Sequence, residues 1–593
     1  MQIQSMDGLV LFDAFYSGGK EVIRQQESLN RINVFPVPDG DTGSNLTLTM
    51  SSIMENSWVS SSAGETIRSM AEAALFGARG NSGIIFAQFL YGLSDSIGEA
   101  GTLTIEMFGK ATREAAAKAY SAIHKPVEGT MLTVIKDWSE AVVGLLPRVT
   151  HFLELFSRSL GRARSSLRET QQKLAVLREN GVVDAGAKGF VHFLHGISEF
   201  LRRGAVDKDE GYSVPEIEDI PHVFDTHEQL AHRYCTEALI REPGIGDEQL
   251  KTEISSFGDS LIVAGTRGMV RVHLHTNNPA DLFLTLHRIG SVIQQKAEDM
   301  VRQFDAIHRR KCPIALVTDS TCDLPGELLD RYQIHVVPLN LIVGESQFLD
   351  RLTIDPEHFY HLMDHSPNYP KTSQPSAAVF RNLYSFLCRH YESVIAIHLS
   401  SRLSGTWNAS KLAAEETANS KKITVIDSKG LSGSLGLIVL RAAEEISSGK
   451  SHEEVVEAVR QTLPKANILV SVSSLKYMVR GGRVSPLKGF LAGVLNLKPI
   501  VSVDGQGHSV LHGKAFSRRA NMNRIIQMVL RLNAESPLRY YAIGHAHAPE
   551  LAAEYSDALS LRLGRTPLYT IDISPIVGLN AGIGAVSVVT LKS

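Results

Sequence analysis

The chain has 593 residues, of which 43% are hydrophobic, 21% are charged and four are cysteines; this is the composition of a globular protein of roughly four domains and excludes a disulfide framework. Its 60 Lys and Arg residues nearly balance its 63 Asp and Glu residues, so no chain-wide basic surface points to nucleic acid, and we expect no nucleic-acid partner. The sequence has no apolar run of about 18 residues and no basic signal region at its start, so we expect a cytoplasmic protein.

The first third of the chain reads as helices. Ala-rich segments such as residues 106–123 and 165–180 have helical periodicity and are joined by Gly-containing loops, so residues 1–202 are predicted to form an all-α domain. Residues 203–224 are polar, include two prolines and show no periodicity, which is typical of a linker.

The rest of the chain mixes strands and helices. Residues 260–275 predict a hairpin flanked by helix-like stretches at 246–257 and 280–303, so we expect a small α+β domain over residues 225–308. Further on, short apolar strands alternate with helices, which favours an α/β domain with a largely parallel sheet over residues 313–593. The chain is therefore predicted to be multidomain.

The motif NVFPVPDGDTGSN (residues 33–45) places two carboxylates, Asp39 and Asp41, in one Gly-containing turn. Because no cation lies near them in the sequence, the carboxylates repel each other, and a bound hard cation is one natural resolution. An EF-hand loop is excluded, since counting from Asp39 puts Ser44 where the glycine should be and Met50 where the glutamate should be. This leaves a Mg²⁺ site or a solvated turn.

Three further Gly-rich segments lie between predicted helices: GARGNSG (77–83), KPVEGTMLTV (125–134) and GVVDAGAKGF (181–190). The first one precedes an apolar helix, so its N–H groups lie at a helix N-terminus, where a phosphate is favoured. It is not a Walker loop, because the spacing differs and the lysine that reaches the phosphates is missing. Taken singly, each segment could equally be an ordinary helix end.

Taken together and in this order, the four segments resemble the nucleotide domain of the fatty acid kinases, which is related to the DhaL nucleotide subunit of the dihydroxyacetone kinases. The resemblance covers roughly residues 7–200 and implies a helical barrel that binds ATP at one end. It implies that Asp39 and Asp41 hold Mg²⁺ against the phosphates and are the catalytic carboxylates. In the dihydroxyacetone kinase branch a further aspartate binds the metal. Asn33 matches the position of that aspartate, except that the spacing differs by one residue. The nucleotide would be lined by Asn45, Gly80, Asn81, Ser82, Thr130 and Met131, with Asp184 and Gly186 closing the site.

A second candidate site lies in the predicted middle domain. In the strand MVRVHLH, alternation puts His273 and His275 on one face, which is common geometry for zinc ligands, although a polar outer strand face is the simpler alternative. The segments HRYCTEALI (232–240) and VRVHLHTNNP (270–279) resemble the middle domain of the same kinases. This resemblance implies that Cys235 joins the two histidines to bind Zn²⁺.

The third candidate site lies in the C-terminal domain. Residues 394–410 read as strand, loop and helix, with Ser404 at the turn, where it could bind an anion or simply cap the helix. A hydrolase elbow is excluded, because Ser404 lacks the flanking glycines. Several segments resemble the DegV family of fatty-acid-binding proteins over roughly residues 313–593: ALVTDSTCDLP, KTSQPS, LSGT, VIDS and RGGRVS.

The DegV resemblance implies an apolar tunnel for an acyl tail and a clamp for its carboxylate. The clamp would consist of Thr372 or Ser373, together with Ser404, with Arg480 and Arg483 as nearby basic groups. Two positions depart from the family pattern. Phe516 stands where an arginine is usual, and Asn580 stands where a histidine is usual. Loss of these groups weakens the expectation that an acyl phosphate is made in this pocket.

The sequence therefore predicts an ATP- and Mg²⁺-dependent kinase that phosphorylates a fatty-acid carboxylate bound by its own C-terminal domain. One alternative is a lipid-sensing regulatory protein with a nucleotide-dependent switch, which Phe516 and Asn580 favour. Another is a kinase for a small polyol such as dihydroxyacetone, although no dihydroxyacetone-binding subunit is recognisable in the chain. The resemblance also implies a homodimer, and it is compatible with peripheral membrane contact during lipid loading.

Overall fold

The computed structural model describes residues 3–36, 40–204, 231–266, 268–344, 346–365, 369–417, 422–474, 476–482 and 497–593. The chain divides into two compact units, Met1–Asn278 with Thr285–Met300, and Pro279–Leu284 with Val301–Ser593. Nearly all of the predicted linker, residues 205–224, lies outside the described residues. No helix in the described part of the chain is both long enough and apolar enough to cross a membrane.

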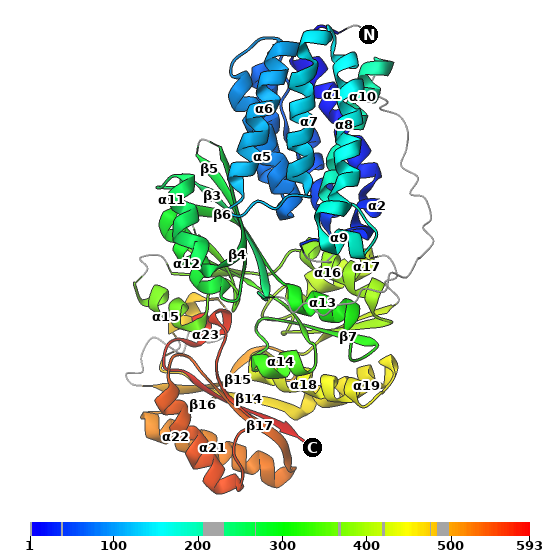
Figure 1. Ribbon diagram of the computed structural model, residues 1–593. Coiled ribbons are helices and arrows are strands. Elements are labelled where there is room, and N and C mark those ends of the chain that lie inside the picture. Colours follow the sequence, from blue (N-terminus) through cyan, green and yellow to red (C-terminus); the bar gives the residue numbers. More distant parts are fainter. Residues whose placement is uncertain are drawn as a thin grey trace. The chain divides into compact units, whose positions relative to one another are not determined.

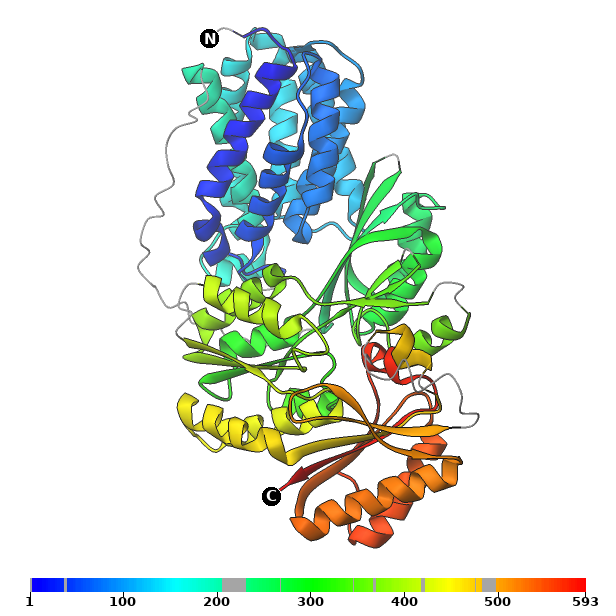
Figure 2. The same cartoon turned by 180° about the vertical axis from the view of Figure 1, so that it is seen from behind.

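Residues 3–36 and 40–204 consist mainly of helices, with two short paired strands, β1 (Ser5–Met6) and β2 (Leu103–Thr104). Figure 1 and Figure 2 show these helices, coloured blue to cyan, lying side by side. They are α1 (Gly8–Arg24), α2 (Gln26–Arg31), α3 (Thr42–Asn56), α4 (Ala63–Gly77), α5 (Gly80–Ile97), α6 (Ile105–Ala122), α7 (Met131–Leu145), α8 (Phe152–Lys173), α9 (Ala175–Glu179) and α10 (Ala185–Arg203), with a 3-10 turn at Leu146–Arg148.

The longer helices close into a ring. Each one packs against the next in the order α1, α3, α4, α5, α6, α7, α8 and α10, and α10 packs back against α1. Buried aromatic rings fill the interior; Phe190, for example, meets Phe89 and Trp138 edge to face, at centroid distances of 5.5 and 5.6 Å. Burial of such large apolar side chains is the main source of stability in a helical ring of this kind. The all-α helical barrel predicted for this region is confirmed.

The remainder of the first unit is built around a four-stranded antiparallel sheet with strand order β4-β5-β3-β6. The predicted hairpin is confirmed as β4 and β5. The elements of this part of the chain are β3 (Tyr234–Arg241), α11 (Asp247–Ile254), a 3-10 turn (Ser255–Phe257), β4 (Gly258–Thr266), β5 (Met269–Thr276), α12 (Pro279–Ile289, whose first six residues belong to the second unit) and β6 (Ser291–Asp299).

The helix predicted over residues 280–303 is wrong in its second half. Helix α12 ends at Ile289, and Gly290 then lies so close to β3 that a Cβ atom there would be 2.7 Å from Ile240 Cγ2. The next nine residues become β6, because pairing with the open edge of β3 satisfies the backbone of both strands.

The second unit contains a four-stranded parallel sheet with strand order β13-β12-β7-β8. The strands are β7 (Ile314–Asp319), β8 (His335–Val337), β12 (Ser393–His398) and β13 (Ile423–Asp427). The helices of this part are α13 (Met300–His308), α14 (Gly326–Arg331), α15 (Pro356–His365), α16 (Ala377–His390), α17 (Thr406–Glu416), α18 (Gly433–Ser447) and α19 (His452–Thr462). The predicted α/β architecture with a parallel sheet is confirmed here.

A second sheet follows, with strand order β16-β15-β14-β19-β17-β18, and only its β17–β18 pair is parallel. Its elements are β14 (Ala466–Ser471), α20 (Lys476–Arg480), β15 (Lys498–Val503), β16 (Ser509–Ala515), α21 (Arg518–Glu535), β17 (Leu538–His545), α22 (Pro549–Leu563), β18 (Thr570–Asp572), α23 (Pro575–Ala581) and β19 (Val586–Lys592), after a 3-10 turn at Leu463–Lys465. A small antiparallel sheet joins β10 (Ser346–Leu349), β9 (Asn340–Val343) and β11 (Lys371–Ser373). Parallel pairing is thus less extensive than the alternating sequence pattern predicted, since a connection as short as that between β15 and β16 permits only antiparallel pairing.

Candidate functional sites

The four predicted loops of the nucleotide site meet at one end of the helical ring. They lead into α3, α5, α7 and α10, which are alternate members of the ring. Because consecutive members are joined by short connections and run antiparallel, alternate members start at the same end. The N–H groups of their first turns and the positive ends of their dipoles therefore gather there, which favours a polyanionic ligand.

Close packing between the loops confirms this convergence. Gly80 has a left-handed backbone (φ 59°), and a Cβ atom on it would lie 2.3 Å from Asn45 Nδ2. A Cβ atom on Gly186 would lie 2.6 Å from Ser82 Oγ. These four predicted site residues are therefore brought together, and the two glycines leave no room for a side chain without displacement of their neighbours.

Asp184 links two of the helix starts. Its Oδ1 accepts the N–H of Ala187 at 2.7 Å as the N-cap of α10, and its carboxylate also accepts the N–H of Met131 at the start of α7. Burial raises the pKa of Asp184 to about 6, against the lowering effect of these hydrogen bonds. Thr130 directly precedes α7 as its N-cap residue. Asp184 therefore connects the loop before α7 to the loop before α10.

Asp41 immediately precedes α3, and its carboxylate does not cap that helix. Asn33 lies against the same helix start, where its Oδ1 accepts the Thr42 hydroxyl at 2.7 Å. The other predicted Mg²⁺ ligand, Asp39, lies outside the described residues. Asn81 Oδ1 is buried and has no hydrogen-bond partner in the described structure. Within the described residues, Asp41 thus makes no capping bond and Asn81 Oδ1 has no partner, so both offer an oxygen at this end.

The predicted metal cluster is assembled on the sheet of the same unit. In the antiparallel register Cys235 faces His275, and Glu237 faces His273. Ligand atoms of Cys235, His273 and His275 all lie within 4.8 Å of one another. Two imidazole nitrogens and one sulfur suit Zn²⁺, with a fourth position left for another ligand.

The protonation and hydrogen bonding of this cluster also fit a metal. Both ring nitrogens of His273 are buried without a hydrogen-bond partner among the described residues. Burial, with the neighbouring His273 and His232, lowers the pKa of His275 to about 3, so this imidazole is in the neutral form that binds metals. Asp259 Oδ1 lies 3.6 Å from His275 Nδ1, where it can orient the ring.

Sequence reasoning missed Glu237, which joins the metal cluster to the nucleotide end. Its side chain is 1% exposed, and its Oε1 accepts the N–H of Gly80, the first residue of α5, at 2.6 Å. Burial alone would raise the pKa of Glu237, but His273, Lys296 and Arg271 hold it well below its ordinary value. Its position two residues after Cys235, on the same strand face, was the available sequence signal.

Arg271 anchors the same polar face of the sheet. It is 1% exposed, and it donates to the carbonyl oxygens of Leu75 and Phe76 at 2.9 and 2.8 Å and to Gln294 Oε1 at 2.8 Å. The two carbonyl contacts hold the sheet against the last turn of α4. The polar face carrying the metal cluster is therefore a wall of the nucleotide end of the barrel.

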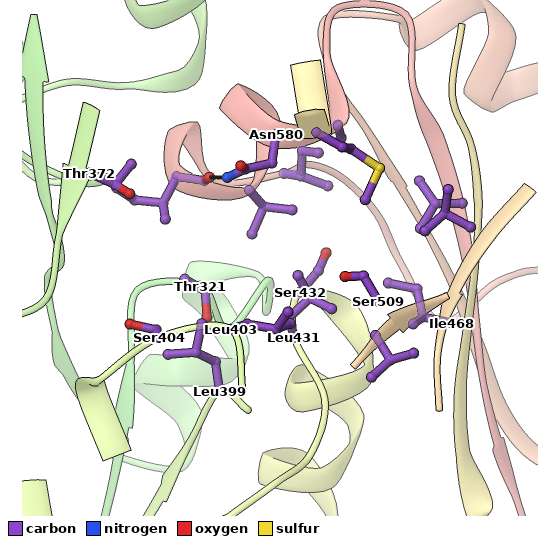
Figure 3. Close-up of a pocket in the computed structure, with 18 of the residues that line it drawn as sticks. Thr321, Thr372, Leu399, Leu403, Ser404, Leu431, Ser432, Ile468, Ser509 and Asn580 are labelled. Carbon is purple, nitrogen blue, oxygen red and sulfur yellow. Dashed lines mark hydrogen bonds between the residues drawn. The ribbon is translucent and has the colours of Figure 1, made fainter. Parts of the chain in front are cut away.

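The second unit contains an apolar cavity of about 420 Å³. One wall consists of residues that follow the carboxyl ends of the parallel strands, including Thr321, Leu399 and Leu431, and the opposite wall includes Ile468 and Val470 of the second sheet. Figure 3 shows the labelled side chains surrounding this space. The carboxyl end of a parallel sheet is the usual ligand-binding edge of an α/β fold.

Three predicted head-group residues, Thr372, Ser373 and Ser404, line this cavity. Figure 3 shows Thr372 and Ser404 on the side away from Ile468. Ser404 Oγ lies 2.9 Å from Thr406 Oγ1 and accepts the N–H of Thr406 at 3.3 Å, directly at the start of α17. The structure thus places hydroxyl groups and a helix N-terminus at one end of an apolar space.

Arg480, one of the two predicted basic groups, is not part of the described lining of the cavity. Arg480 is exposed and stacks over the Tyr369 ring at 5.3 Å, and Arg483 lies outside the described residues. Phe516 is 65% exposed and is not part of the lining, whereas Asn580 is part of it and donates to the Ile576 carbonyl at 3.1 Å. Among the described residues, the lining contains no charged side chain.

Three family models match consecutive parts of the chain. Residues 36–199 match the DAK2 domain, residues 231–307 match the FakA-like middle domain of fatty acid kinases, and residues 313–593 match the uncharacterised proteins of the DegV family.

Similar proteins include uncharacterized proteins of Staphylococcus epidermidis and Staphylococcus aureus. Each is 33% identical, over 321 and 323 residues respectively, and each alignment covers 52% of this chain. The chain spans only 58% of the length of these relatives.

Similar solved structures include DegV from Bacillus subtilis, described as a fatty acid binding protein (29% identity, TM-score 0.44, covering 48% of this chain and 100% of that one). Another is a DegV family protein from Thermus thermophilus, described by its fatty acid binding (26% identity, TM-score 0.44, covering 47% and 100%). From the family models, the chain joins a DAK2 domain, a FakA-like middle domain and a DegV-family region in one polypeptide.

Proposed function

We propose that this protein is an ATP- and Mg²⁺-dependent kinase that phosphorylates the carboxylate of a fatty acid bound in its own DegV-family region. The observation that carries the proposal is the convergence of four helix starts at one end of the DAK2 ring. The neighbouring middle domain matches a family named after a fatty acid kinase, which supports the acceptor class.

In this proposal the phosphates of ATP bind at the starts of α5 and α10, near Ser82 and Gly186. Asp39 and Asp41 would hold Mg²⁺, which, when bound, offsets the negative charge of the transferring phosphoryl group. Asn45, Gly80 and Asn81 would contact the nucleotide from one side, and Thr130 and Met131 from the other. The N–H groups at these helix starts need no side-chain charge to bind an anion.

The acyl tail would fill the apolar cavity, and the carboxylate would lie against the hydroxyls of Thr372, Ser373 and Ser404 at the start of α17. In the transfer, a carboxylate oxygen attacks the γ-phosphorus of ATP as the bond from that phosphorus to the bridging oxygen breaks. The bonding pair stays on the β-phosphate of ADP, and no proton moves. Positioning and charge stabilisation suffice, so no covalent enzyme intermediate is required.

The cluster of Cys235, His273 and His275 would hold Zn²⁺. Bound zinc would cross-link β3 and β5 beside the nucleotide end. Glu237 lies on β3 opposite His273 of β5, so the cross-link would also fix the position of the carboxylate that binds the start of α5.

A second candidate function is a lipid-sensing regulatory protein with a nucleotide-dependent switch. The described lining of the cavity has no charged side chain, and Phe516 points to solvent where a basic group was expected. A carboxylate in this cavity would be bound by hydroxyl and N–H groups only, which is sufficient for binding but weaker for stabilising a transferred phosphoryl group.

The deciding experiment uses the full-length protein purified from cells. Denaturing extraction and mass spectrometry identify the bound lipid, and the intact protein is then incubated with γ-labelled ATP and Mg²⁺. We expect a co-purified fatty acid that becomes labelled acyl phosphate. Bound fatty acid that stays unphosphorylated would favour the lipid-sensing function, and labelled dihydroxyacetone phosphate in a polyol screen would favour the polyol kinase.

The homodimer, the cytoplasmic location and peripheral membrane contact also belong to the proposal. Light scattering of the purified protein measures the first. Cell fractionation tests the second, and flotation with phospholipid vesicles tests the third.

A further inference from the structure

Lys296 is a partly buried cation of the middle domain that the proposed reaction has not yet used. It lies on β6, opposite Glu237 of β3 in the antiparallel register, two residues from Glu298, which faces Cys235. Its side chain therefore belongs to the polar face of the sheet that carries the metal cluster. The sequence pattern had assigned this segment to a helix, which hid this placement.

Lys296 is surrounded by carboxylates. Its Nζ lies 3.1 Å from Glu298 Oε2, and 24% of its side chain is exposed. Glu237 and Asp41 are also within electrostatic range. Burial alone would lower the pKa of Lys296, but the carboxylates of Glu298 and Glu237 outweigh it and raise this pKa well above its ordinary value. The ion pair with Glu298 thus places the Lys296 ammonium on this face of the sheet.

The surroundings of Lys296 connect it to both parts of the nucleotide end. Its neighbour Glu237 binds the N–H of Gly80 at 2.6 Å, so this sheet face is fixed at the start of α5. Asp41, at the start of α3, is close enough to interact electrostatically with Lys296 and with Cys235. Lys296 thus lies opposite the residue that binds the start of α5, on the sheet face next to the proposed phosphate site.

We propose that the Lys296 ammonium binds phosphate oxygens of the nucleotide beside Asp41 and is a catalytic residue of the phosphoryl transfer. This inference rests on the proposed kinase function. The loop at residues 77–83 has no lysine, and its one cation, Arg79, lies 3.8 Å from Glu237 Oε2. In this proposal a strand of the middle domain supplies the lysine that a Walker loop carries itself. A highly charged nucleotide competes with Glu298 for the ammonium, and the fixed cation then stabilises the charge that develops on the γ-phosphoryl group.

The test compares Lys296→Met and Lys296→Arg with the wild-type full-length protein loaded with fatty acid. At saturating ATP and Mg²⁺ we expect the kcat of Lys296→Met for acyl phosphate formation to fall about 100-fold. Lys296→Arg keeps the charge and is expected to stay within about tenfold of wild type. Lys251→Met is the matched control, because Lys251 also joins the middle domain to the barrel, through the Ser121 carbonyl, but pairs with Glu248 instead. Its kcat should not change.

A purely structural role for Lys296, namely neutralising nearby carboxylates, gives different results. It predicts that removing a carboxylate in Lys296→Met/Glu298→Gln restores kcat, whereas phosphate binding predicts no restoration. Wild-type kcat in Lys296→Met, or full rescue by the double variant, would overturn the proposal. Zinc content and circular dichroism show whether each variant is folded. If Lys296→Met does not fold, the test is made with Lys296→Arg.

Failure of the kinase function is separable from failure of this inference. If the wild type makes no acyl phosphate, the proposed reaction fails, and binding of the β,γ-imido analogue of ATP with Mg²⁺ tests Lys296 by itself. We then expect about tenfold weaker binding in Lys296→Met, the usual loss for a charge-assisted hydrogen bond, and nearly unchanged binding of AMP. Equal binding of the analogue by both proteins would contradict the role of Lys296.

Discussion

Asp41 shows how a single residue gains meaning from its surroundings. In the sequence it is a carboxylate without a nearby cation. In the structure it directly precedes α3, and its side chain does not cap that helix. Asp41 thus lies at the end of the barrel where the loops meet, and its carboxylate is not used for capping.

We expect Asp41→Ala to lower the rate of acyl phosphate formation about 1000-fold, because a Mg²⁺ ligand contributes several kcal/mol of charge stabilisation in the transition state. The helical circular dichroism should be unchanged, since Asp41 makes no capping bond. Asp95→Ala is the control, because Asp95 lies in the last turn of α5 and pairs with Lys118 at 2.8 Å. Wild-type turnover in Asp41→Ala would remove the assignment.

The metal cluster makes a second prediction at the residue scale. Cys235→Ser replaces a thiolate ligand by a weak one, so we expect zinc measured by inductively coupled plasma mass spectrometry to fall from about one equivalent to well below it. Cys388→Ser, which changes a half-buried thiol elsewhere, should retain its zinc. If both variants keep equal zinc, Cys235 is not a ligand.

At the scale of elements, helix starts carry the nucleotide end. Alternation of direction around the ring was not visible in any single loop, yet it decides that Gly80 of α5 meets Asn45 of α3 and that Gly186 of α10 meets Ser82 of α5. Strand β6 shows the opposite case. Residues 280–303 have a helix-like sequence pattern, but residues 291–299 form a strand. They pair with the edge of β3, and this tertiary pairing outweighs their local helix propensity.

Asp184, the N-cap of α10, makes the stability of this element depend on pH. Its pKa is about 6 in the folded protein against an ordinary value of 3.8. Below about pH 4 the carboxyl is protonated in both states. Between pH 4 and 6 the unfolded chain releases the proton while the folded one keeps it, so stability falls as the pH rises, by about 3 kcal/mol in total.

We therefore expect Asp184→Asn, which keeps the capping oxygen but removes the charge, to have a Tm close to wild type at pH 4 and several degrees higher at pH 7. Differential scanning calorimetry from pH 4 to 7 measures this. Asp7→Asn is the control: Asp7 is the N-cap of α1, so this variant shows the effect on Tm of replacing a capping carboxylate by an amide elsewhere. A Tm difference for Asp184→Asn that stays constant with pH would contradict the buried-charge explanation.

At the scale of the whole molecule, the important feature is that three family regions share one chain. Covalent linkage raises the local concentration of a bound fatty acid to about millimolar when the linker allows the two sites to meet. We expect the rate of acyl phosphate formation per chain to stay constant when the loaded protein is diluted from about 10 to 0.1 μM, because transfer within one chain is first order. A rate per chain that falls in proportion to dilution would show transfer between separate molecules.

The sequence by itself determined the helical character of residues 3–36 and 40–204, the β4–β5 hairpin, the strand–helix alternation after residue 313 and the shared strand face of His273 and His275. Each rests on periodicity or on short motifs, which are local properties of the chain. Only the tertiary structure decided the positions of Glu237, Arg271 and Lys296 at the nucleotide end, the antiparallel pairing in the second sheet and the absence of Arg480 from the described cavity lining. These depend on which strand pairs with which and on which side chains are buried together, and such contacts join residues far apart in the sequence, where no local pattern records them.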